Sequence, residues 1–136
     1  MRGFTIAPSM VTATRVSATA AALELIARLE QSHGALLFHQ SGGCCDGSSP
    51  MCFPRGEFMI GEADVLLGEI GGQPFYMSES QFAYWSHTHL IIDVVQGRGG
   101  MFSLEGPQGL RFLTRSRLYT DEEWRALPAV THGPRG

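Results

Sequence analysis

The first regular pattern of apolar and polar residues in the chain is a helical one. Between residues 17 and 34 the apolar residues recur at intervals of three and four positions, with polar residues between them. These positions are Ala22, Leu25, Ile26 and Leu29. Because this spacing places side chains on one face of a helix, it predicts an amphipathic helix near the start of the chain. Ser17 is the predicted N-cap, and Gly34 is the predicted stop, where glycine accepts a left-handed backbone.

After residue 34 the pattern changes to short apolar runs separated by glycine-containing links. Strands are expected at 35–40, 57–61, 63–70 and 73–77, and three more within 89–115. The pair Gly71 and Gly72 is typical of a hairpin turn, since the central positions of such turns require positive φ. Short helices are expected at 78–85 and 120–127, which begin with the capping patterns S-x-x-Q and T-x-x-E.

This order of elements predicts an α+β fold. A helix comes first, about seven strands follow, and a short helix ends the folded part. The links leave little room for crossover helices, so most neighbouring strands should run antiparallel. A chain of 136 residues suits one domain, which we place at 16–127, between a flexible lead-in at 1–15 and a flexible tail at 128–136.

The charge pattern and the missing motifs exclude several functions. The formal net charge is −3 and all ten basic residues are arginines, which argues against nucleic-acid binding and against lysine-based covalent catalysis. No apolar run is long enough to span a membrane, and the N-terminal segment lacks the apolar core of a signal peptide, so we expect a cytoplasmic protein. The dinucleotide motif is incomplete and no G-x-S-x-G elbow occurs, so neither a nucleotide cofactor nor a serine hydrolase is expected.

All three cysteines lie in one glycine-rich run, SGGCCDGSSPMC at 41–52, which is expected to be a loop. Thiolates are preferred ligands of zinc and of iron–sulfur clusters, so Cys44, Cys45 and Cys52 are candidate metal ligands. Adjacent cysteines point in different directions, so only one of Cys44 and Cys45 is expected to share a site with Cys52. The alternatives are reactive thiols, buried structural residues and a disulfide formed by oxidation.

Histidines supply the other candidate site residues. His87 and His89 stand two positions apart at the start of an expected strand, so both should project from one face and converge on one ion. His39 ends the strand before the cysteine loop, where an imidazole can orient a thiolate or lower its pKa. His39, Cys44 and Cys45 are therefore the candidate catalytic residues. For each histidine the alternative is a structural role.

Three strings in the chain resemble a known family. HQSGGCCDGSSPMC, YWSHTHLIIDVVQGRGGMFSLE and GLRFLTRSRLYTDEEW look like the bacterial family catalogued as domain of unknown function 779, over about residues 16–125. That family has no established activity, but its members are commonly encoded near aldehyde or alcohol dehydrogenases. The resemblance therefore implies an accessory role in aldehyde metabolism, with such a dehydrogenase as the partner.

The layout of the chain also resembles the HesB-like A-type iron–sulfur carriers, which have a Gly-Gly-Cys-Ser-Gly turn after their first helix and strand. This second resemblance implies a partly barrel-like sheet, and it matches Cys44 to the first carrier cysteine. The carriers' terminal Cys-Gly-Cys is missing here. Cys52, His87 and His89 would have to replace it.

These observations lead to three hypotheses. The favoured one is a metal-binding accessory protein that is not an enzyme and holds zinc, iron or an iron–sulfur cluster. Its candidate ligands are Cys44, Cys45, Cys52, His87 and His89. The second is a redox or aldehyde-processing protein that acts through a cysteine thiolate, and the third is a docking partner of a dehydrogenase without chemistry of its own. Self-association through a sheet edge, giving a homo-oligomer, is compatible with all three.

Overall fold

The computed structural model describes residues 13–40, 48–97 and 103–133, and this part of the chain forms a mixed α+β fold. The helices are α1 (Ala20–His33), α2 (Glu79–Trp85), α3 (Asp121–Ala126) and the short 3₁₀ helix η2 (Gly106–Gln108). The strands are β1 (Val16–Ala18), β2 (Leu36–Gln40), β3 (Met51–Pro54), β4 (Asp64–Ile70), β5 (Gln73–Ser78), β6 (Thr88–Gln96), β7 (Leu110–Leu118) and β8 (Thr131–His132).

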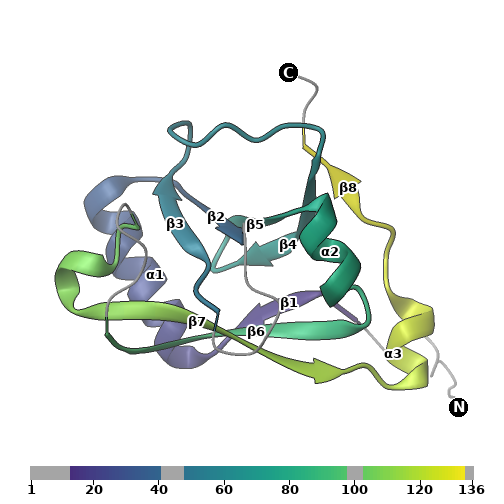
Figure 1. The fold of residues 1–136 in the computed structure, drawn as a ribbon. Helices are drawn as coiled ribbons and strands as arrows, with labels where there is room; N and C mark the ends of the chain where they lie inside the picture. The colour runs from purple at the N-terminus through teal and green to yellow at the C-terminus, as the bar shows by residue number, and fades with distance from the viewer. Residues whose placement is uncertain (1–12, 41–47, 98–102, 134–136) are drawn as a thin grey trace, which may run out of the picture.

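The strands form two sheets that face each other across the core (Figure 1). The large sheet has the order β3-β2-β5-β4-β8, and the small sheet has the order β1-β6-β7. Phe38 and Phe75 of the large sheet stack with their ring centroids 6.1 Å apart, and Phe112 of the small sheet packs edge-on against Phe38 at 5.1 Å. These three rings join the two sheets, and α1 closes the core with its apolar face.

Helix α1 confirms the helical pattern, because all four of its predicted apolar residues are buried. The N-cap is Thr19, whose hydroxyl accepts a hydrogen bond from the Ala22 N–H at 3.2 Å. The prediction of Ser17 as the cap is wrong, because Ser17 lies in β1, which precedes the helix and pairs in parallel with β6. The helix is therefore not the first element of the fold. Gly34 ends it with φ 80° and donates its N–H to the Glu30 carbonyl.

The strands differ from the prediction in three places. Strand β3 lies partly inside the stretch expected to be a loop, residues 57–61 form no strand, and the described part of 89–115 holds parts of two strands where three were expected. Strand β3 is at the edge of its sheet, a position that tolerates Pro54. In the segment 57–61 Phe58 packs against Phe53 at 4.6 Å and Met59 is 88% exposed, an alternation like that of a strand, but none of these residues pairs with a described strand.

The predictions for the glycine turn and for the caps of the two short helices are confirmed, except that Gln81 Oε1 has no partner among the described residues and so does not complete a capping box in α2. Gly71 and Gly72 connect β4 to β5 with φ 57° and 80°, as a tight hairpin requires. The hydroxyls of Ser78 and Thr120 cap α2 and α3, and Thr120 forms a complete capping box with Glu123.

The described strands do not form a single barrel-like sheet, so that part of the fold prediction is wrong. Four of their pairings are antiparallel and two, β1 with β6 and β2 with β5, are parallel. The mostly antiparallel character is thus confirmed, and each of the two sheets contains one parallel pair. Strand β8 lies in the predicted tail and pairs with β4. Among the described helices, none is long and apolar enough to cross a membrane.

Candidate functional site

His39 and Asp64 form a buried pair on the outer face of the large sheet. Successive side chains of a strand alternate, so Phe38 faces the core and His39 faces the opposite side of β2. His39 is 4% exposed, and its Nε2 is 2.7 Å from Asp64 Oδ1. Because a carboxylate can only accept, Nε2 carries the hydrogen and donates it. Asp64 Oδ2 accepts from the Gly61 N–H at 3.0 Å, and the Phe58 ring packs against the imidazole at 4.7 Å, so the pair is held in one orientation.

The cysteine loop begins directly after this strand. Cys44 and Cys45 lie outside the described residues, but the residues on both sides of the loop are placed. Gln40 Oε1 accepts a hydrogen bond from Thr114 Oγ1 at 2.9 Å, and the Ser48 carbonyl accepts one from the Thr114 N–H at 2.7 Å. Both ends of the loop are therefore attached to the same residue of β7.

Cys52 lies inside the core, beside a buried carboxyl group. It is the cross-strand partner of Phe38 and is completely buried. Burial, and then the charge of Glu105, raise the pKa of the Cys52 thiol well above its ordinary value, and burial also raises the pKa of Glu105. Ser103 Oγ links the two residues, since it accepts from the Cys52 N–H at 2.8 Å and donates to Glu105. This environment favours a protonated thiol, whereas a metal ligand or a nucleophile must be a thiolate.

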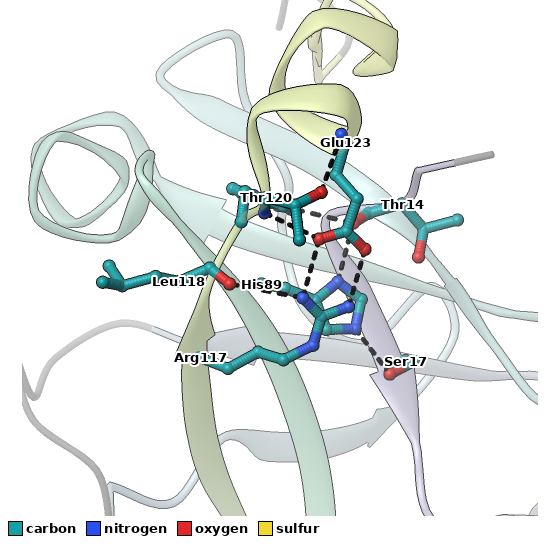
Figure 2. Close-up of polar contacts among 8 residues, drawn as sticks. Thr14, Ser17, His89, Arg117, Leu118, Thr120 and Glu123 are labelled. Carbon is teal, nitrogen blue, oxygen red and sulfur yellow. Dashed lines mark hydrogen bonds and ion pairs between the residues drawn. The ribbon is translucent and has the colours of Figure 1, made fainter. Parts of the chain in front are cut away.

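His87 and His89 lie in different surroundings. Strand β6 begins one residue after His87, which is exposed in the turn that follows α2 and stacks on Trp124 at 5.3 Å. His89 is 6% exposed, and both of its ring nitrogens are engaged: Nε2 lies 2.7 Å from Ser17 Oγ, and Nδ1 lies 2.7 Å from the Thr14 carbonyl oxygen (Figure 2). A metal ion bound to His89 would have to displace one of these partners.

The described residues contain no group of three His, Cys, Asp or Glu side chains arranged to bind a metal ion. By themselves, the described donors do not fit zinc, iron or an iron–sulfur cluster: Cys52 is a core thiol, His87 stacks on Trp124, and both ring nitrogens of His89 are engaged. A metal site built on Cys44 and Cys45 falls outside the described part of the chain and stays a prediction.

These features define a class of protein: an α+β fold of two facing sheets, in which a buried histidine–carboxylate pair lies on the strand that enters a cysteine-containing segment. The model of the family described as Domain of unknown function (DUF779) matches residues 25–118, and the chain belongs to this family. The match runs from within α1 to the end of β7 and confirms the resemblance seen in the sequence. No curated protein and no solved structure matches the chain.

Sequence reasoning missed three partners: Asp64 for His39, Ser17 for His89 and Glu105 for Cys52. Asp64 lies 25 residues from His39, and Ser17 lies 72 residues from His89, so no local motif links either pair. Their contacts follow from the strand order. The spacing of Ser103 and Glu105 was the one local signal, because a hydroxyl two positions from a carboxylate can reach it.

Proposed function

We propose that the protein binds and processes small aldehydes through a thiolate of Cys44 or Cys45, with His39 as its acid–base partner and Asp64 as a positioning residue. The observation that carries this proposal is the hydrogen bond of 2.7 Å between His39 Nε2 and Asp64 Oδ1. A carboxylate on one ring nitrogen fixes the orientation of an imidazole and stabilises the imidazolium that forms when the ring takes a proton. An imidazolium beside a thiol in turn favours the thiolate.

The small number of residues between His39 and the cysteines Cys44 and Cys45 is compatible with this pairing of an imidazole and a thiol. Cys44 and Cys45 follow His39 by five and six residues. A fully extended chain of that length spans at most about 17 to 21 Å, at ~3.5 Å per residue. Because Gln40 and Ser48 are both attached to Thr114, the two residues that flank the cysteine-containing segment lie close together.

The proposed step is an addition without oxidation or reduction. His39 takes the thiol proton, the thiolate sulfur forms a bond to the aldehyde carbonyl carbon, and the π electron pair of the carbonyl moves to its oxygen. The imidazolium then returns the proton to that oxygen, which gives a neutral hemithioacetal. The proposal includes an aldehyde or alcohol dehydrogenase, the partner implied by the family resemblance, as the protein that consumes the released aldehyde.

Alkylation of each cysteine by iodoacetamide, followed by peptide mass spectrometry from pH 5 to 9.5, tests the thiolate. We expect Cys44 or Cys45 to react at pH values well below the ordinary thiol range of about 8.5. His39→Gln should return the profile to that range. His33→Gln is the control, because His33 is an exposed histidine in the last turn of α1. Its alkylation profile should equal that of the wild type.

A second measurement tests the aldehyde. A ¹³C-labelled small aldehyde should give a hemithioacetal resonance that disappears when the reactive cysteine is replaced by serine. The proposal is contradicted if both loop thiols titrate in the ordinary range in the wild type. It is also contradicted if protein purified without an affinity tag carries a full equivalent of zinc or iron and its thiols react only after chelation, a result that would support the metal-binding hypothesis instead.

A further inference from the structure

Ser17 and His89 form a second polar site, on the outer face of the small sheet. Figure 2 shows the ring of His89 between Ser17 and Thr14, with Ser17 Oγ 2.7 Å from Nε2 and the Thr14 carbonyl oxygen 2.7 Å from Nδ1. Ser17 lies in β1 and His89 lies in β6, and these strands pair in parallel. Both side chains are therefore carried by strands of the same sheet, which fixes their distance more firmly than loops would.

The partners of the ring decide which nitrogen carries the hydrogen. A backbone carbonyl can only accept, so Nδ1 of His89 donates to Thr14. In a neutral imidazole Nε2 then has no hydrogen, and the Ser17 hydroxyl donates to it. This is the arrangement in which an imidazole can take the proton from an attacking hydroxyl.

The described side chains around this dyad are aromatic rings and arginines. Arg15, whose charge acts on Tyr119, donates from Nη2 to the Pro128 carbonyl at 2.9 Å, and its buried Nε has no partner among the described residues. The Tyr119 ring meets the His89 ring edge-on at 6.1 Å, and Trp124 packs beside Tyr119 at 6.1 Å. Arg117 is the cross-strand partner of His89, and each oxygen of Glu123 accepts from its guanidinium at 2.9 Å. The two aromatic rings can contact a small apolar group of a ligand.

We propose that Ser17 is a nucleophile activated by His89, and that this dyad cleaves small carboxylic esters. Ser17 Oγ forms a bond to the ester carbonyl carbon while its proton passes to His89 Nε2, and the π electron pair moves to the carbonyl oxygen. When the carbonyl reforms, the bond to the leaving alkoxide breaks and the alkoxide takes the proton from Nε2. Water then hydrolyses the acyl-Ser17 with the same base. This activity is separate from the chemistry proposed for the cysteines. It departs from the expectation, drawn from the missing G-x-S-x-G motif, that the chain is not a serine hydrolase, because Ser17 meets its base through strand pairing and not through that motif.

Labelling by an alkyl fluorophosphonate tests the nucleophile directly. In that reaction an Oγ–P bond forms, the P–F bond breaks, fluoride leaves and the proton again passes to Nε2. We expect one adduct, which peptide mapping places on Ser17, and an acetyl group at the same residue after acid quenching of a reaction with p-nitrophenyl acetate. Ser17→Ala should abolish both, and His89→Gln, whose amide can still donate to the Thr14 carbonyl, should slow labelling by about 100-fold or more.

Ser80→Ala is the matched control, because Ser80 is an exposed serine whose described side-chain bond is to a hydroxyl. This variant should be labelled like the wild type. The wild-type protein decides the proposal even if a variant unfolds: no adduct on Ser17, under conditions that fully label a serine hydrolase in the same tube, overturns it. Labelling of Ser17 at the wild-type rate in a folded His89→Gln variant also overturns it, because the imidazole would then not be the base.

Discussion

Each sheet carries one buried histidine on its outer face, and the two differ in the chemistry of their partners. His39 donates to the carboxylate of Asp64, whereas His89 donates to the Thr14 carbonyl and accepts from the Ser17 hydroxyl. The contact distances are equal at 2.7 Å, so neither distance nor burial distinguishes them. A carboxylate can compensate a positive imidazole, while a carbonyl together with a hydroxyl suits a neutral one. The partner therefore decides which proton transfers each ring can support.

Removal of each partner tests this contrast, and it should give the largest effects on stability. Asp64→Ala removes an ionised acceptor from the buried His39 and from the Gly61 N–H, so we expect the free energy of unfolding to fall by about 3 kcal/mol. Ser17→Ala removes a neutral partner of His89 and should cost about 1 kcal/mol. Urea unfolding followed by circular dichroism measures both losses. Asp64→Asn keeps the shape without the charge and should fall between them; equal losses for the two alanine variants would contradict the contrast.

The His39 site should also depend on strand β8, which has no counterpart at His89. Gly133 donates its N–H to the Asp64 carbonyl at 2.8 Å, and a Cβ added at Gly133 would collide with the Gly61 carbonyl oxygen. Since the Gly61 N–H holds Asp64 Oδ2, we expect Gly133→Ala to lower the free energy of unfolding by about 2 kcal/mol. Gly61→Ala is the matched control, because its Cβ would meet nothing within 4 Å.

Urea unfolding of the two alanine variants, together with the NMR signals of both imidazoles, distinguishes local from global effects of β8. Gly133→Ala should shift the ring signals of His39 and leave those of His89 unchanged. If Gly133→Ala and Gly61→Ala destabilise the protein equally, close packing of β8 does not support Asp64.

Cys52 extends the comparison to a buried ionisable group without a compensating charge. Its folded-state pKa is raised by burial and by Glu105, whereas in the unfolded chain the thiol titrates at about 8.5. The stability that the protonated thiol provides is therefore fully present below about pH 8.5 and is lost as the pH rises above it, by about 1.4 kcal/mol per pH unit. Urea unfolding at several alkaline pH values should show this slope in the wild type and not in Cys52→Ala. Parallel curves for the two proteins would show that Cys52 ionises as easily in the folded state as in the unfolded one.

Local interactions made much of the fold predictable from the sequence. The apolar face of α1, the glycine hairpin between β4 and β5, and the cap of α3 each depend on residues within a few positions of one another. Strand β3 was missed because its four residues follow a run of glycine and serine and owe their conformation to pairing with β2. The division into two sheets was missed for a similar reason, since the parallel pairing of β1 with β6 joins segments far apart in the chain.

The candidate sites were less predictable, because side-chain chemistry in a sheet depends on the neighbouring strand. The sequence identified His39 and His89 as candidates but could not show that one contacts Asp64 and the other Ser17. The histidine pair was expected to share a strand face, but β6 begins after His87, so the alternation of side chains does not include it. For the cysteines the sequence left a buried structural role open as an alternative, and Cys52 has this role, but clustering in the sequence could not show which cysteine lies in the core.

The ion pair between Arg117 and Glu123 provides an exposed counterpart to His39 and Asp64, and its effect should be the smallest. Hydrogen bonds from Arg117 and Thr120 lower the pKa of Glu123 to about 2, from an ordinary value of 4.5. Because the folded-state pKa is lowered, the stabilisation is present above about pH 4.5 and is lost as the pH falls towards 2.

In this pH range the free energy of unfolding of the wild type should therefore fall more steeply with acidification than that of Glu123→Gln, and 1 M salt should narrow the difference. Glu69→Gln, at an exposed position of β4, serves as the control and should follow the wild type. A Glu123 effect as large as that of Asp64→Ala would show that solvent exposure does not weaken the pair, and it would contradict the ranking of the two sites.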